Sequence, residues 1–493
     1  MAPITRIRPP SGRRPEPRLS TSRAANLRRI GALAWPVLIG QLAVIGFSTV
    51  DTLLVARASP EDLAALSVGS AAYITVFIGM MGVVLAIGPI VGQLFGAGQR
   101  AQAGRQLHQA AWVALGLAAG GALLLAFPFP FLALAQATPD MEARIRGYLL
   151  ALAVALPAAL LVQAYRGFNN AISRPKAVMA LQVGGLALKV PLSTLLVFGA
   201  PGLGLPALGV LGCGIATAIV MWLQAGVAWA VLRHDRFYAP FELLGRGLDK
   251  PDRRAIGTQL RLGVPMGLSI LIEVSAFSLM AVFIARLGVT ASAGHQIAAN
   301  LASVMFMLPL SLSSATMTLV AQRVGASDPQ DARRLAWHGL QGALAVSATL
   351  ATAVWLGRDA VVRLYTADTA IAAVAVPLLA WVALLHVADA AQALASFVLR
   401  AYRIATVPML VYAGSLWGLG LVLGYVLAFD TTGTTPVVLR GPAGFWLGAT
   451  TGLVVAAVAL CWLMARTVRR HAAAISETVN VVARPVMPAA DAG

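Results

Sequence analysis

The chain has very little charge for its length. Of its 493 residues, 11% are charged and 59% are hydrophobic, and the mean hydropathy is +0.79. Charged residues make up about a quarter of an ordinary soluble domain. The composition therefore excludes a soluble globular protein and predicts one that crosses the membrane many times.

Several kinds of catalytic and cofactor motif are also missing. The six histidines are scattered, and the sequence contains no HExxH, GxSxG or GxxxxGK[ST] motif. This argues against an integral membrane enzyme and against an ATP-driven pump. Two cysteines, Cys213 and Cys461, are too few for a disulfide framework or a cysteine-based metal centre. We therefore expect no catalytic residues and no cofactor, and neither cysteine is given a function.

The chain contains many apolar stretches of about twenty residues, each long enough to cross a membrane as a helix. They predict an all-α integral membrane protein with twelve transmembrane helices. The spans are 30–56, 63–92, 106–127, 145–164, 177–198, 207–231, 261–285, 291–320, 335–356, 371–398, 406–428 and 443–465.

The net charge of +18 sorts by position along these spans. With the N-terminus inside, cytoplasmic segments carry 29 of the 37 Lys and Arg residues and the outside carries seven. This bias predicts that both termini are cytoplasmic, and it explains the positive charge without a nucleic-acid partner.

Five regions follow from the spans. Residues 1–29 form a basic tail that we expect to be disordered, 30–232 an N-lobe, and 261–468 a C-lobe. Residues 233–260 link the lobes on the cytoplasmic side, and their aromatic residues favour an interfacial helix over a binding domain. Residues 469–493 form a cytoplasmic C-terminal tail.

The two lobes share an internal repeat. The first copy has Leu33 to Pro36 and VGQLFGA from Val91 to Ala97, and an offset of 229 leads to Leu262, Pro265 and VAQRVGA from Val320 to Ala326. Two similar six-helix lobes around a central cavity are typical of secondary transporters. The matched prolines Pro36 and Pro265 are candidate hinges.

Three carboxylates lie inside predicted spans: Asp51, Glu273 and Asp389. Glu273 is about 18 and 20 Å along the helix from Arg261 and Arg286, which places it near the midplane. A charge at this depth costs at least about 2.5–3.5 kcal/mol and marks a site of function. None of the three is repeated in the other lobe. We predict that they couple transport to a cation, and sodium and protons both remain open.

Lys189 is the only Lys or Arg residue that lies inside a span and away from its ends. We expect it to face the N-lobe interior and pair with Asp51, and the alternative is a neutral or water-solvated lysine in the cavity wall.

Other residues are weaker candidates for a substrate or ion cavity, and packing is the alternative for each. His386 lies three residues before Asp389 and is a candidate for tuning its pKa. The remaining candidates are His295, Gln296, Asn300, Tyr73, Phe277 and Met305.

Several longer segments carry a resemblance to a known family. HQIAANLASVMFMLPLSLSSATMTLVAQRVGA (His295 to Ala326), TVDTLLVARASPEDLAALSVG, and PALGVLGCGIATAIVMW (Pro206 to Trp222) resemble the multidrug and toxic compound extrusion (MATE) family. Further matches are IEVSAF around Glu273 and the Asp-Ala-x-Gln run that starts at Asp389. Within the family the chain is similar to the NorM-type bacterial exporters.

The resemblance implies a V-shaped cavity and efflux of organic cations and amphipathic drugs, driven by entry of sodium or protons. It implies that Asp51, Glu273 and Asp389 are the coupling residues. We expect a bacterial inner-membrane protein that works as a monomer. A lipid-linked oligosaccharide flippase of the same superfamily is the alternative, although it should show several basic residues in the cavity for pyrophosphate, and only Lys189 fits.

Overall fold

The computed structural model describes residues 22–482, apart from 130–131, 133–137, 201, 203 and 244–247. These residues are almost entirely helical, and no extended strand occurs among them beyond one isolated bridge, Ala200 with Leu205. Twelve helical segments are long and apolar enough to cross a membrane. The prediction of an all-α fold with twelve spans is confirmed, and the chain is a multi-pass membrane protein.

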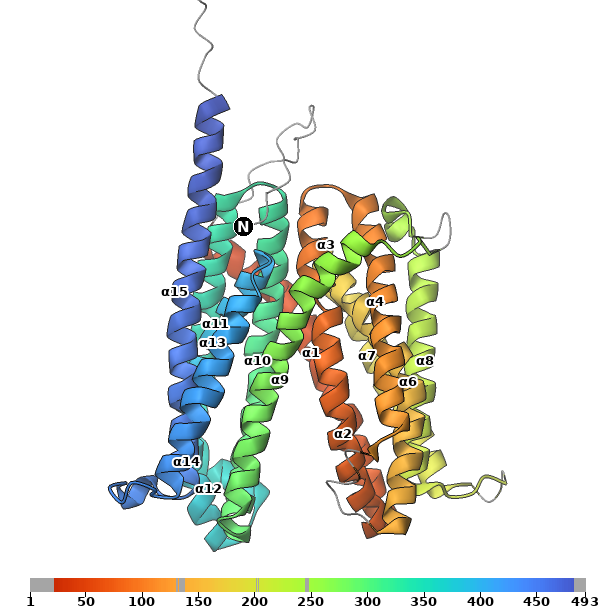
Figure 1. Cartoon of the computed structure of the whole chain (residues 1–493), viewed down its shortest axis with the longest axis vertical. Coiled ribbons are helices and arrows are strands. Elements are labelled where there is room, and N and C mark those ends of the chain that lie inside the picture. The colour runs from red at the N-terminus through yellow and green to blue at the C-terminus, as the bar shows by residue number, and fades with distance from the viewer. Residues whose placement is uncertain are drawn as a thin grey trace, which may run out of the picture.

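The first six spans form the N-lobe and the last six the C-lobe (Figure 1). The N-lobe helices are α1 (Arg23–Ala58), α2 (Pro60–Val84), α3 (Ile87–Gly96), α4 (Arg100–Ala126), α6 (Pro139–Ala171), α7 (Pro175–Phe198) and α8 (Gly209–His234). The C-lobe helices are α9 (Arg253–Ala285), α10 (Val289–Gly325), α11 (Pro329–Tyr365), α12 (Thr369–Ala401), α13 (Thr406–Tyr412), α14 (Val422–Ala428) and α15 (Pro442–Val482). Three short segments complete the list: η2 (Arg236–Phe241), η3 (Ala413–Leu421) and η4 (Val437–Leu439).

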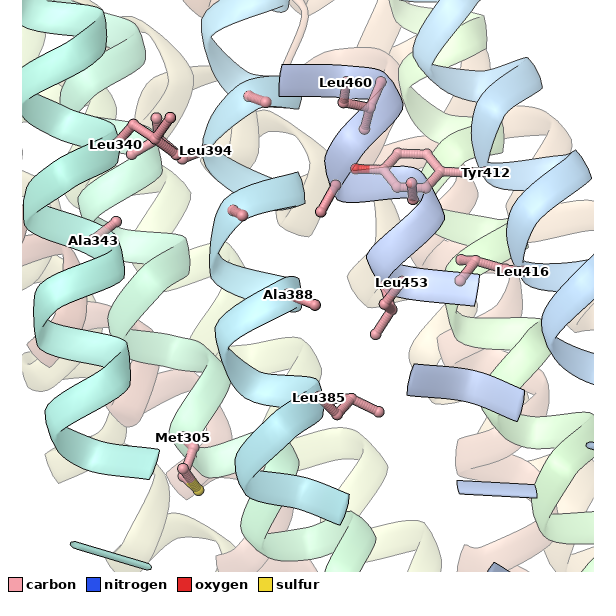
Figure 2. Close-up of a cluster of buried hydrophobic side chains, with 14 of the residues drawn as sticks. Met305, Leu340, Ala343, Leu385, Ala388, Leu394, Tyr412, Leu416, Leu453 and Leu460 are labelled. Atoms are coloured by element: carbon pink, nitrogen blue, oxygen red, sulfur yellow. The ribbon is translucent and has the colours of Figure 1, made fainter. Parts of the chain in front are cut away.

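Each lobe has its own hydrophobic core. The N-lobe core is built by α2 to α8, and the larger C-lobe core by α9 to α15. Figure 2 shows part of the second, in which Leu385 and Leu394 of α12 lie between Leu340 of α11 and Leu453 of α15. Ile30 and Ala34 of α1 join the C-lobe core. The first helix therefore ties the two lobes together.

Two predicted spans are interrupted. The second breaks at Leu85–Ala86 into α2 and α3, because Pro89 has no N–H to donate to the carbonyl of Leu85. The eleventh contains η3, a nine-residue π-helix. Gly420 there faces Gly448 of α15 across a contact with no room for a side chain, so close packing accompanies the irregular turn.

Both predicted tails are shorter than expected. Residues 1–21 and 483–493 lie outside the described part, but the prediction of disorder up to Arg29 is wrong, because α1 begins at Arg23. Ser22 caps its N-terminus by accepting from the Ala25 amide at 3.2 Å. Asn26 then contacts the His338 ring at 3.1 Å. At the other end α15 continues to Val482, well past the predicted limit of 468.

In its described residues, which leave out 244–247, the linker does not form the predicted interfacial helix. Helices α8 and α9 take its ends, and η2 between them is a six-residue 3-10 helix. Its Tyr238 and Phe241 are buried against the N-lobe, where Phe241 meets Phe168 edge-on with ring centroids 5.4 Å apart. The Phe237 amide and the Arg174 guanidinium hold the pKa of Asp235 below its usual range. Tyr238, Phe241 and Leu243 are covered by protein, whereas Phe237 is exposed, so part of the linker closes the base of the N-lobe.

Tyr238 makes one of the buried hydrogen bonds that hold this closure, and His108 makes another with the Leu243 carbonyl. The Tyr238 hydroxyl donates to Asn169 Oδ1 at 2.5 Å. Tyr238→Phe leaves that oxygen buried without its donor, and we expect a loss of about 1–3 kcal/mol of stability. Thermal unfolding of the purified protein measures it, with the exposed Tyr365→Phe as control. Equal melting temperatures for the two variants would contradict the role of the linker.

Candidate functional site

The N-lobe carboxylate lies in a buried ion pair. Asp51 Oδ1 is 2.8 Å from Lys189 Nζ, and the lysine side chain is 0% exposed. The ammonium also donates to Thr217 Oγ1 at 2.6 Å, and the Cys213 thiol donates to Asp51 Oδ1 at 2.8 Å. The predicted pairing of Lys189 with Asp51 is confirmed. Removing one member of such a buried pair costs about 3–5 kcal/mol, because the other is left uncompensated.

Three helices bring this N-lobe group together. Asp51 is on α1, Lys189 on α7, and Cys213 and Thr217 are on α8. Cys213 and Thr217 are four residues apart and so share one helical face, which is the signal that sequence reasoning passed over. Ser193, one turn after Lys189, has a buried hydroxyl with no hydrogen-bond partner.

The C-lobe carboxylates are joined through an amide. Gln392 Nε2 donates to Asp389 Oδ1 at 2.7 Å and reaches Glu273 Oε1 at 3.4 Å. Gln392 in turn accepts from the hydroxyl of Tyr412, which Figure 2 shows beside α15. Gln392 belongs to the Asp-Ala-x-Gln run, whereas Tyr412 was not predicted, since one aromatic in an apolar helix gives no signal.

The two lobes differ in how the negative charge is balanced. Within the described residues, no Lys, Arg or His nitrogen lies within 4.0 Å of Glu273 or Asp389, whereas Asp51 has Lys189 at 2.8 Å. His386 and the buried Arg400, both on α12, make no ion pair with either acid, although the charge of Arg400 acts on Glu273 at longer range. Two neighbouring carboxylates without a bound counterion favour uptake of a proton or another cation.

Most of the other predicted polar residues lie apart from the carboxylates. In the described part, no hydrogen bond or ion pair joins His386, His295, Gln296 or Asn300 to them. His386 and His295 are buried, and the His295 ring packs near Trp446 with centroids 5.8 Å apart. Gln296 is exposed, and Asn300 accepts from the Tyr365 hydroxyl at 2.9 Å. For Asn300, interhelical bonding is the interpretation that the contacts support.

The predicted apolar residues divide in the same way. Met305 is buried in the C-lobe core (Figure 2), so packing describes it. Tyr73 stacks on Phe77 with ring centroids 5.5 Å apart. Phe277 lines a small, partly open apolar pocket between α9, η3 and α15, one turn beyond Glu273. Phe277 is thus the member of this group that faces open space.

The lobes meet at the end of the molecule that carries the linker. Helices α2 and α9 touch through Gly82 and Gly267, and in Figure 1 they diverge from this contact toward the opposite end. Helices α3 and α10 touch through Gly96 and Gly325, where an added Cβ would collide with the backbone carbonyl of Gln322 or Gln93. Without side chains at these glycines, the helix backbones come into direct contact.

Two glutamines bond across this contact in the same way. Gln93 Nε2 donates to the Ala401 carbonyl of the C-lobe, and Gln322 Nε2 to the Ala171 carbonyl of the N-lobe, both at 2.7 Å. Each caps the end of a helix in the opposite lobe. Gln93 and Gln322 are 229 positions apart, as are Gly96 and Gly325. The internal repeat therefore gives equivalent contacts from each lobe to the other, related by a pseudo-twofold axis. These contacts hold the lobes together at the end of the molecule that carries the linker.

Comparison with known families decides the classification. The MatE family model matches residues 36–195 and 265–426, which is most of the chain. The chain belongs to the MatE family. The two matched blocks begin at Pro36 and Pro265, so the repeat found in the sequence is the duplication that this family model describes. Both prolines lie inside their helices, α1 and α9, and their role as hinges stays a prediction.

Curated relatives and solved structures agree with the MatE assignment. The chain is 41% identical to "Probable multidrug resistance protein NorM" of Aromatoleum aromaticum, over 89% of this chain and 93% of the relative. It is 36% identical to "Multidrug resistance protein PmpM" of Pseudomonas aeruginosa, over 90% and 92%. The fold is similar to the Vibrio cholerae MATE transporter VcmN in its bent form, with TM-score 0.81, 18% identity and coverage of 92% and 99%. The eukaryotic MATE transporter AtDTX14 gives TM-score 0.80, 19% identity and the same coverage.

Proposed function

We propose that this protein is a secondary active multidrug efflux transporter that exchanges organic cations and amphipathic drugs for sodium or protons by alternating access of its two lobes. Multidrug resistance is what the names of its relatives describe. The observation that carries ion coupling is the C-lobe pair, in which Glu273 and Asp389 share Gln392 and lack a cation within 4.0 Å among the described residues. The proposed activity is transport rather than catalysis.

The charge bias supports a cytoplasmic position for both termini of a bacterial inner-membrane protein. In that orientation the closed contact around Gly96 and Gly325 is on the cytoplasmic side, and the diverging ends of α2 and α9 face outward (Figure 1). Both lobes, with the carboxylates of each, belong to one chain, which supports function as a monomer.

The flippase alternative is disfavoured by the charges of the site. Pyrophosphate recognition requires free basic groups, but the ammonium of Lys189 is already committed to Asp51.

Accumulation of ethidium in a bacterial strain that lacks its own efflux pumps tests the proposal. Cells that express the protein are expected to hold several-fold less dye than cells with an empty vector, and collapse of the ion gradients should abolish the difference. Equal accumulation, with the protein folded and inserted, would contradict multidrug efflux.

A further inference from the structure

The N-lobe site contains a cation that is part of the chain. Lys189 Nζ lies 2.8 Å from Asp51 and 2.6 Å from Thr217 Oγ1, and the Phe47 ring lies over it with 5.6 Å from Nζ to the centroid. The side chain is completely buried. The ammonium thus has a carboxylate, a hydroxyl and an aromatic face around it, which are groups that stabilise a desolvated cation.

The C-lobe has no equivalent. The repeat places the π-helix η3 (Ala413–Leu421) opposite the part of α7 that carries Lys189, and η3 contains no basic residue. Glu273 and Asp389 have the Gln392 amide between them instead, with no basic nitrogen within 4.0 Å in the described part of the lobe. Among the described residues, a built-in cation in direct contact with the site carboxylate is therefore a property of the N-lobe, whereas the buried Arg400 of the C-lobe acts on Glu273 only at longer range.

We propose that Lys189 is a tethered cation that fills the N-lobe carboxylate site and excludes free metal ions from it. Binding of a free coupling cation is then confined to Glu273 and Asp389 in the C-lobe. This inference rests on the proposed function and assigns Lys189 as the residue that determines where a coupling ion binds.

The oxygen atoms of the N-lobe site explain the exclusion. A sodium ion needs oxygen ligands. Two side-chain oxygens of this site, Asp51 Oδ1 and Thr217 Oγ1, already contact the Lys189 ammonium through an ion pair and a hydrogen bond. Ser193 Oγ, one turn along α7, is buried and has no partner. An entering metal ion would have to displace an ammonium that has no exposed surface. In Lys189→Asn, the space of the ammonium is surrounded by the Asp51 carboxylate, the hydroxyls of Thr217 and Ser193, and the amide oxygen of the new side chain. These oxygen ligands suit a hard cation such as sodium.

Equilibrium binding of ²²Na⁺ to purified protein tests this directly. The double variant Glu273→Gln/Asp389→Asn serves as background, because it removes the C-lobe carboxylates. We expect this background to bind no sodium, Lys189→Asn to add about one sodium per protein, and further Asp51→Asn to abolish it. Lys189→Arg is the matched control, since it keeps the charge and should add no binding.

Two results would overturn the inference. One is sodium binding by the background protein that disappears with Asp51→Asn, because the site would then be open despite Lys189. The other is a folded Lys189→Asn variant that gains no sodium, because the ammonium would then not occupy a place fit for a metal ion. Melting temperature in choline chloride shows whether the variant is folded.

A second measurement needs no change at Lys189. Asp51→Asn in the otherwise natural protein, assayed well below its own melting temperature because Lys189 loses its partner, is expected to leave the amount of bound ²²Na⁺ unchanged. A loss of sodium by the folded variant would overturn the inference even if Lys189→Asn did not fold. Neither assay involves a drug. A failure of ethidium efflux would therefore count against the proposed function and would leave the sodium-binding result interpretable by itself.

Discussion

Replacing Gly96 and Gly325 together by leucine is expected to reduce drug efflux by at least about tenfold. A side chain at either position would collide with the backbone of the opposite lobe at Gln322 or Gln93. The closed contact between the lobes then cannot form, and the outward-open state of the proposed transport cycle is lost. A shift of about 1.4 kcal/mol between two states already changes their ratio tenfold, and a backbone collision exceeds that.

Efflux assays and melting temperatures of the same preparations measure this effect. The control is Gly116→Leu with Gly120→Leu, because an added Cβ meets nothing within 4 Å at either glycine of α4. The two lobes have separate cores, so the Gly96/Gly325 variant should remain folded while transport fails. Efflux at the wild-type rate would show that closure of this contact is not part of the transport cycle.

Neutralising the C-lobe carboxylates is the second change with a large expected effect. Glu273→Gln and Asp389→Asn should each reduce gradient-driven efflux by at least about tenfold, because an amide neither takes up a proton at neutral pH nor replaces a carboxylate as a charged cation ligand. Asp359→Asn, an exposed acid of α11, is the matched control and should behave as wild type.

Stability separates the roles of the carboxylates in the two lobes. Asp389→Asn removes one of two like charges and is expected to leave the melting temperature unchanged or raised. Asp51→Asn leaves the ammonium of Lys189 buried without its partner and should destabilise the protein by about 3–5 kcal/mol. If Asp389→Asn and Asp51→Asn lowered the melting temperature by the same amount, the difference in charge balance between the two lobes would be contradicted.

Much of the fold could be predicted from the sequence because lipid constrains it strongly. The twelve spans follow from runs of apolar residues, and the two lobes from the 229-residue repeat. The interruptions were harder to predict. Pro89 breaks its span, whereas Pro309 and Pro377 lie inside continuous helices, so a proline alone does not predict a break. The π-helix around Gly418 depends on packing between helices, which a hydropathy pattern does not report. The burial of Tyr238 and Phe241 under the N-lobe also depends on partners that are distant in sequence.

The charged residues of the site could be predicted from the sequence, but the neutral residues that bond to them could not. Asp51, Lys189, Glu273 and Asp389 could be selected by depth alone, because each is costly in a membrane. Cys213, Thr217 and Tyr412 are ordinary residues of membrane helices, and only the fold brings them to the carboxylates. His386, three residues before Asp389, makes no hydrogen bond with it in the described structure, and its influence on the pKa of Asp389 stays a prediction.

Ethidium transport in proteoliposomes, with sodium and proton gradients imposed separately, tests the central claim most directly. The account predicts that a gradient of at least one of these ions drives dye movement against its own gradient. It also predicts that Glu273→Gln/Asp389→Asn abolishes the driven movement and that Asp359→Asn does not. Driven transport that survives loss of both C-lobe carboxylates, or dye movement that is indifferent to both gradients, would contradict ion-coupled efflux through this site.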